Sequence, residues 1–336
     1  AMRPWRAAMA VGLAVELVWS AEAKSAPASA DAKQWKHSHH TSCKSWRCRG
    51  INFTARDEAS IRDCQQQVPV RAASSSVGLP GSSPPDEPFY LFIMCPPFSG
   101  SSATLSMIAT SPRVATLCPF KTWQCEGTFE LVKRKMIKGK ERWAPGPGIY
   151  NWTEVLPVYE EAWQKDIQRK GPQAFIRVDK SPPFIQQVDG LAAHFTGRAS
   201  QVAFLFVTRS PCYWSRLNTV SKWDHYAQML VHGLEVVQRS RFKHMVLQYE
   251  KLVTSPCAAA EDVLRWLPNL ETLNPGRSGY FTRSKKRNKS VVDYALAKAS
   301  KRVPLTRPTS TCIGVNVRET SRQLGYRDED WLSSVV

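Results

Sequence analysis

The stretch from Pro88 to Pro112 constrains the fold more than any other part of the chain. An apolar run, FYLFIM, ends at CPPFSGSSAT, and the segment LSMIATSP follows with helical character. A strand that turns through glycine and small hydroxyl residues into a helix gathers backbone N–H groups around one point, where the helix dipole adds partial positive charge. The sequence therefore predicts an anion cradle in which Gly100 lets a phosphate approach the main chain. Its residues are Ser99, Gly100, Ser101, Ser102 and Ala103.

The cradle lacks the Gly-Lys-Ser/Thr ending of a Walker A loop. That ending supplies the lysine and hydroxyl with which P-loop kinases hold magnesium-ATP. The sequence therefore favours a phosphate-bearing ligand and disfavours a P-loop kinase.

The 336 residues carry a formal net charge of +18, which favours a polyanionic partner. Such a partner is a nucleotide cosubstrate, an acidic glycan, a nucleic acid or a membrane surface. Nucleic acid is disfavoured because no recognisable binding motif is present. The densest basic run extends from Arg283 to Lys289, and its alternative interpretation is a solvated loop.

The first 87 residues differ in composition from the rest. Basic residues, a mostly apolar run and small residues near position 23 predict a signal peptide or short signal anchor over 1–23. The run is short for the roughly 20 residues of a membrane span, so we expect membrane contact only through such an anchor. Residues 24–87, rich in Ala, Ser and Pro, predict a stem or linker of low order, and 88–336 a folded domain.

Nine cysteines suit an oxidising lumen and leave one unpaired. Cys95 is the best candidate for a buried free thiol because it ends the apolar run, whereas Cys118 and Cys125 bracket a short loop that a disulfide can close. The cluster HSHHTSCKSWRC over 37–48 matches no standard zinc spacing, so we expect no metal site. Three sequons, at Asn52, Asn151 and Asn288, are compatible with a secreted glycoprotein.

Short apolar segments alternate with amphipathic ones from Phe89 onward, which predicts an α/β fold: three layers, with a mostly parallel sheet flanked by helices. Their near-continuous apolar character suits strands covered on both faces. The expected strands are 89–94, 114–117, 174–178, 202–208 and 245–248.

Three polar segments follow the ends of expected strands. They are the cradle, DKSPPF from Asp179, and TRSPCYW around Arg209. Ligands of open parallel sheets bind at the carboxyl ends of the strands. If the strands are neighbours, these segments surround one site. Arg209 offers a planar fork of donors to phosphate oxygens, and its alternative is a structural salt bridge.

Taken together, these segments resemble the sulfotransferases that use 3′-phosphoadenosine 5′-phosphosulfate (PAPS). PPFSGSSAT looks like the family's phosphosulfate loop, DKSPPF is similar to its Glu-Lys-Ser/Thr-Pro segment, TRSP resembles its 3′-phosphate arginine motif, and LQYEKLVTSP is similar to its Tyr-Glu-Asp-Leu strand. The resemblance covers roughly 88–268. It implies a P-loop-like fold, PAPS as the cosubstrate, no metal, and a Golgi or secreted location.

The resemblance also implies roles for individual residues. Glu126 matches in position the carboxylate that takes the acceptor proton, with Asp179, His194 and His225 as weaker candidates, and Lys180 is placed to neutralise the leaving group. The alternatives are an exposed loop carboxylate and a surface lysine. A basic loop is expected to close over the adenosine through Arg283, Lys285 and Lys286.

Phe98 stands where the family usually has lysine or arginine, two residues before the loop glycine. Either Lys180 or Lys285 takes over, or the fold binds nucleotide or sulfated glycan without transfer. The acceptor is expected to be a carbohydrate or another molecule with a hydroxyl or amine. Trp143, Tyr150 and Trp152 are either stacking residues for it or, as we favour, packing residues.

Overall fold

The computed structural model describes residues 44–48, 53–72, 87–117, 125–139, 141–143, 150–214, 220–277, 290–301, 309–313, 315–327 and 332–334. The chain divides into two units, Ala1–Cys43 and Lys44–Val336, and all described residues belong to the second.

A five-stranded parallel sheet forms the centre of the domain, with the strand order β4-β5-β3-β6-β7. Its strands are β3 (Phe89–Met94), β4 (Val114–Thr116), β5 (Ile176–Asp179), β6 (Val202–Thr208) and β7 (Lys243–Gln248). The sequence placed β3 and β6 at their observed bounds, and the other three strands within two residues of theirs. The predicted α/β class, with a mostly parallel sheet between helices, is confirmed.

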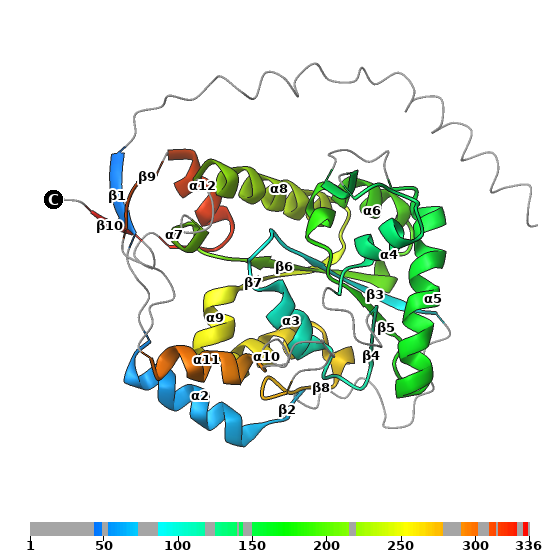
Figure 1. The fold of residues 1–336 in the computed structure, drawn as a ribbon, viewed down its shortest axis with the longest axis horizontal. Coiled ribbons are helices and arrows are strands. Elements are labelled where there is room, and N and C mark those ends of the chain that lie inside the picture. The colour runs from blue at the N-terminus through cyan, green and yellow to red at the C-terminus, as the bar shows by residue number, and fades with distance from the viewer. Residues whose placement is uncertain are drawn as a thin grey trace, which may run out of the picture. The chain divides into compact units, whose positions relative to one another are not determined.

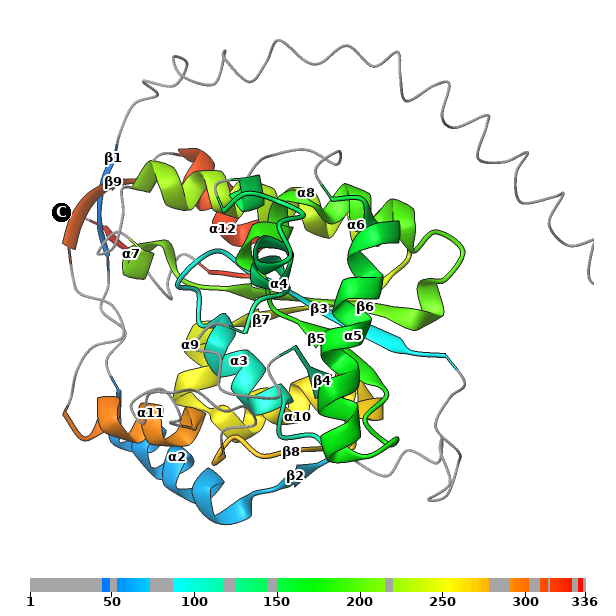
Figure 2. The same cartoon turned by 45° about the vertical axis from the view of Figure 1, so that its right-hand side comes forward.

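Helices cover both faces of the sheet (Figure 1). One face carries α4 (Gly127–Lys133), α5 (Trp152–Lys170), α6 (Val188–His194), α8 (Val220–Arg239) and α12 (Val315–Gln323). The other carries α2 (Ala55–Gln67), α3 (Ser101–Ile108), α9 (Tyr249–Thr254), α10 (Pro256–Trp266) and α11 (Val291–Ala299). Successive β3 side chains alternate between the two cores, which explains why the whole strand is apolar. The view in Figure 2 shows the same two helical layers.

Shorter elements complete the described part of the chain. They are α7 (Pro211–Trp214), the 3-10 helices η3 (Glu141–Trp143), η4 (Pro182–Gln186), η5 (Ala199–Gln201) and η6 (Pro268–Leu270), a pair of strands β2 (Val70–Arg71) and β8 (Thr272–Leu273), and a three-stranded sheet of β1 (Lys44–Cys48), β9 (Thr309–Ile313) and β10 (Leu332–Ser334).

Helix ends follow local sequence signals. Asn151 caps α5 by accepting a hydrogen bond from the Thr153 amide, and the helix ends at Gly171 with basic residues in its last turn. Helix α10 begins at Pro256, since the fixed φ of proline suits the first position of a helix.

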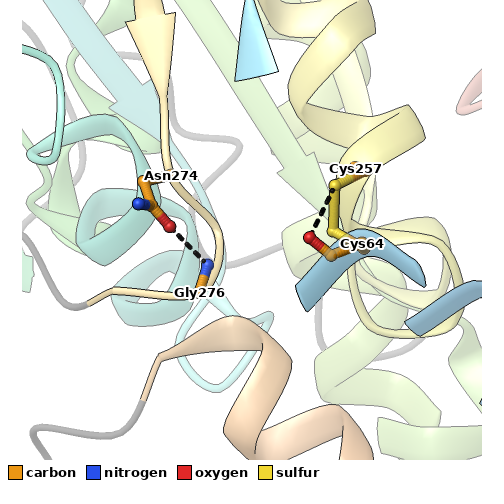
Figure 3. Close-up of a disulfide and its surroundings, with 4 residues drawn as sticks. All are labelled: Cys64, Cys257, Asn274 and Gly276. Atoms are coloured by element: carbon orange, nitrogen blue, oxygen red, sulfur yellow. Dashed lines mark hydrogen bonds between the residues drawn. A yellow bond between two sulfur atoms is a disulfide. The ribbon is translucent and has the colours of Figure 1, made fainter. Parts of the chain in front are cut away.

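Part of the segment expected to be a stem belongs to the folded domain. Residues 55–67 form α2, with Ile61 and Cys64 buried against α10 and α11, and a disulfide joins Cys64 to Cys257 of α10 (Figure 3). The expectation of low order therefore fails for this part of 24–87. A helix with few apolar residues was missed because two buried side chains do not make a periodic stripe.

Cys95 is buried and free, as predicted from its place at the end of β3. Cys125 and Cys212 are disulfide-bonded. Cys118, the expected partner of Cys125, lies outside the described residues.

Within the described ranges, no helix is long and apolar enough to cross a membrane, and no three His, Cys, Asp or Glu residues are grouped to hold a metal ion. The His37–Cys43 part of the His/Cys cluster and the proposed signal lie outside those ranges.

Candidate active site

The three polar segments singled out in the sequence lie side by side at the carboxyl ends of neighbouring strands. Strand β3 pairs with β5 on one side and β6 on the other, all parallel, so the segments that follow their carboxyl ends are neighbours. Open α/β sheets bind their ligands at these carboxyl ends.

The cradle after β3 is a tight turn leading into α3. Gly100 caps the helix in the left-handed region, with φ of 95°. The amide of Ser99 donates to Pro96 O at 3.4 Å, and the amide of Ala103 donates to Gly100 O at 2.9 Å. These two of the predicted donors are thus engaged within the loop.

Gly100 is required by a neighbouring side chain as well as by its own backbone. A Cβ atom at this position would lie 2.0 Å from a ring carbon of Tyr249, the first residue of α9. The sequence interpretation assigned the glycine to phosphate approach. The structure shows that the Tyr249 ring already occupies the space beside the glycine.

Arg209 links three of the four motif segments: its own, the one that contains Phe98 and the one that contains Tyr249. Its guanidinium carbon lies 4.2 Å from the centroid of the Tyr249 ring, and its Nη1 donates to Phe98 O at 2.6 Å. The residue is only 7% exposed. Together these contacts hold a cation beside the cradle, where an aromatic face stabilises it.

Phe98 directly precedes the cradle and is exposed. It has a φ of 63°, unusual for a non-glycine residue, and 63% of it is exposed. Its ring therefore stands at the surface, while its carbonyl accepts the hydrogen bond from Arg209.

A buried ion pair joins the end of β5 to the start of α4. Lys180 Nζ donates to Glu126 Oε1 at 3.0 Å, and the two side chains are 5% and 10% exposed. Arg142 approaches the other oxygen, Glu126 Oε2, at 3.9 Å and lies over the Phe129 ring. Glu126 and Lys180 are therefore neither an exposed loop carboxylate nor a surface lysine.

Asp179 and Ser181, on either side of Lys180, accept hydrogen bonds from the backbone amides of the two residues after Glu126. Asp179 Oδ1 accepts from the Gly127 amide at 2.9 Å, and Ser181 Oγ accepts from the Thr128 amide at 3.2 Å. Asp179, which ends β5, and the two residues after it thus bind three successive residues at the start of α4. Asp179 holds the backbone next to Glu126 and does not contact the Glu126 carboxylate in the described interactions.

Burial raises the pKa of Asp179 from 3.8 to about 7, and the nearby Glu126 charge adds to the rise. The Gly127 and Ser181 hydrogen bonds and the charge of Lys180 act in the opposite direction. Desolvation is the larger effect because the carboxyl is completely buried.

Cys95 connects this ion pair with the cradle. Burial raises the pKa of its thiol to about 12, against the opposing effects of Lys180 and of a hydrogen bond with the Ser101 side chain. In the sheet Phe92 pairs with Asp179, so Lys180 lies next to the end of β3, where the Cys95 thiol hydrogen-bonds with Ser101 at the start of α3.

Other candidate residues fall elsewhere. Arg283, Lys285 and Lys286 lie outside the described residues. Tyr150 and Trp152 are buried against Phe184, which supports the packing interpretation. His194 packs beside Phe195, which contacts Tyr90 at the opposite end of β3, and His225 is exposed on α8.

Arg142 was missed in the sequence. It lies nine residues after the end of α4 and follows five other basic residues, which fall between positions 133 and 140. Nothing in that pattern distinguishes the arginine that approaches Glu126.

No family model and no curated protein matches the chain. Among solved structures, the sulfotransferase domain of the Synechococcus PCC 7002 olefin synthase aligns at 15% identity and a TM-score of 0.40, over 73% of this chain and 98% of that one. Sulfotransferase STF1 from Mycobacterium tuberculosis H37Rv aligns at 12% identity and a TM-score of 0.36, over 71% and 76%. At this level of similarity, any functional assignment rests on the residues of the site itself.

Replacing Gly100 by Ala should lower the free energy of unfolding by about 1–3 kcal/mol, because the new Cβ meets Tyr249 and the left-handed backbone is strained. Denaturant unfolding measures the change. Gly139→Ala is the matched control, since nothing lies within 4 Å of its Cβ position, and it should change stability by less than about 0.5 kcal/mol. Equal effects of the two variants would contradict this role of Gly100.

The free energy of unfolding of the Asp179→Asn variant, relative to that of the wild type, should increase as the pH rises from 4 to 8. In the wild type the unfolded carboxyl ionises near its ordinary pKa of 3.8 while the folded one stays protonated up to about 7, so stability falls across this range. The difference between variant and wild type should grow by at least about 1 kcal/mol, because each unit of pKa difference is worth about 1.4 kcal/mol. Denaturant unfolding at several pH values tests this, and a constant difference would refute it.

Proposed function

We propose that this protein is a sulfotransferase, which moves a sulfuryl group from PAPS to a hydroxyl or amine of an acceptor, with a carbohydrate as the leading acceptor class. The observation that carries the proposal is the buried Lys180–Glu126 pair beside the anion cradle. A base and a cation next to a phosphate site are the groups that sulfuryl transfer requires.

The residues present fit a nucleotide with phosphates at both ends. The start of α3 provides backbone donors and the helix dipole for the 5′-phosphosulfate. Arg209, fixed over Tyr249, provides a planar set of donors for the 3′-phosphate. The proposal includes Arg283, Lys285 and Lys286 as the cationic loop over the adenosine.

The two charged side chains of the pair have complementary tasks in the reaction. Glu126 accepts the proton of the acceptor hydroxyl or amine as that group forms its bond to sulfur. Lys180 stabilises the negative charge that develops on the bridging oxygen as the old S–O bond breaks and 3′-phosphoadenosine 5′-phosphate leaves. Asp179 and Ser181 keep Glu126 in place by holding the two amides after it.

Phe98 favours a second candidate function, the binding of nucleotide or sulfated glycan without transfer. Its exposed ring cannot donate to a phosphate oxygen, and it stands directly before the cradle, where a cation would assist the reaction. In the leading proposal Lys180 supplies the missing cation, because it follows β5 beside the end of β3, from which the cradle continues.

We place the protein in the secretory pathway, in the Golgi lumen or outside the cell. The Cys64–Cys257 disulfide supports this location because such bonds form and persist in oxidising compartments. Asn151, one of the three sequon asparagines, is exposed at the start of α5.

Wild-type protein should bind 3′-phosphoadenosine 5′-phosphate in a calorimetric titration, and Arg209→Ala should weaken that binding at least about tenfold, because a hydrogen bond to a charged group contributes about 1.5–3 kcal/mol. Arg265→Ala, on the surface of α10, removes the same charge and should leave the affinity within about twofold. Absence of binding by the wild type would defeat the proposal.

A further inference from the structure

The loop that carries Arg209 is held by the C-terminal part of the chain. The amide of Ser210 donates to Glu250 Oε1 at 2.9 Å. The hydroxyl of Tyr326 donates to Glu250 Oε2 at 3.0 Å and lies 3.1 Å from Thr208 Oγ1. The residues on both sides of Arg209 are therefore tied to one buried carboxylate and one buried phenol.

A defined helix ending places Tyr326 in this network. Gly325 follows α12 in the left-handed region, with φ of 82°; its amide donates to Arg322 O, and the amide of Tyr326 donates to Ser321 O. These two bonds form a Schellman motif, in which glycine at the turning position reverses the chain. Gln248 Nε2, at the end of β7, donates to Gly325 O at 2.8 Å and fixes the turn against the sheet.

The network is buried, so each of its hydrogen bonds matters. Glu250 is 8% exposed, and Thr208, Ser210 and Tyr326 are less exposed still. Burial raises the pKa of the Glu250 carboxyl and of the Tyr326 phenol. A carboxylate in such surroundings remains stable only when its oxygens accept hydrogen bonds, and here both do.

The main chain of Arg209 is held from a third side. The indole of Trp223, on α8, donates to Arg209 O at 3.1 Å. The backbone of Thr208, Arg209 and Ser210 is therefore fixed by side chains from α8, α9 and the turn after α12. A guanidinium mounted on a fixed backbone loses less entropy when it binds a ligand.

We infer that Tyr326, acting through Glu250, is a positioning residue for the phosphate-binding arginine. The inference rests on the proposed function, because it assumes that Arg209 binds the 3′-phosphate of the nucleotide. It assigns a role to a residue that lies 76 positions from its partner along the chain and in none of the four motif segments.

The test compares two Tyr→Phe variants, each of which loses a phenolic hydroxyl. Tyr326→Phe removes the hydroxyl bonded to Glu250, and Tyr90→Phe removes the hydroxyl that donates to Glu160 at 2.8 Å, near the other end of the sheet. Binding of 3′-phosphoadenosine 5′-phosphate is measured by calorimetry and folding by denaturant unfolding. Tyr326→Phe should raise the Kd about tenfold, which corresponds to about 1.4 kcal/mol, while Tyr90→Phe should leave it within about twofold.

A milder variant and a kinetic readout complete the test. Thr208→Val keeps the side-chain shape, removes the contact with Tyr326, and should raise the Kd about threefold. With labelled PAPS, Tyr326→Phe should raise the donor KM and leave kcat within about twofold.

The outcomes separate the inference from the proposed function. Wild-type binding with unchanged affinity in Tyr326→Phe, or equal losses in the Tyr326 and Tyr90 variants, would overturn the positioning role and leave the nucleotide site standing. No binding by the wild type would overturn both.

Discussion

The hydrogen-bonded ion pair between Lys180 and Glu126 is the contact on which the organisation of the site depends. It joins the end of β5 to the start of α4, and its neighbours Asp179 and Ser181 bind the next two amides of the same helix. A buried charge pair is weak evidence of stabilisation, because removing both ions from water costs about as much as their attraction returns. The burial of the pair therefore does not by itself indicate a gain in stability.

A second set of contacts organises the other half of the site. Tyr249 packs on Gly100 and under the guanidinium of Arg209, whose Nη1 bonds to Phe98 O. The pairing of Phe92 with Asp179 brings the two halves together at the ends of β3 and β5. The four segments that resemble sulfotransferase motifs thus meet in space, although Phe98 and Glu250 lie 152 positions apart in the chain.

The predictable part of this structure is the part encoded locally. Strands β3 and β6 are continuous apolar runs because both of their faces are covered, and their bounds follow directly from the sequence. The starts of α5 and α10 coincide with short-range signals, the Asn151 cap before Trp152 and the proline at Pro256. Lys180 and Arg209 were selected because each follows a strand end, and Glu126 because it matches the position of a family carboxylate, but the bond between Glu126 and Lys180 was not foreseen. Arg142 was missed because it stands among other basic residues that the sequence does not distinguish from it. Tyr326 was missed because its partner lies 76 positions away, and a single sequence holds no record of such a pairing. Helix α2 was missed for a different reason: its attachment depends on two buried residues and a disulfide, not on an apolar stripe.

The most direct test of the account is the transfer of labelled sulfate from PAPS to a pool of glycans and other hydroxyl-bearing acceptors, with wild-type protein, Glu126→Gln and the exposed control Glu154→Gln compared at equal nucleotide occupancy. The account predicts transfer by the wild type and the control, and a rate at least about 100-fold lower in Glu126→Gln, since a positioned base contributes about 10²–10⁴ in rate. A wild-type protein that binds the nucleotide but transfers no label, or a Glu126→Gln variant as fast as the wild type, would contradict it.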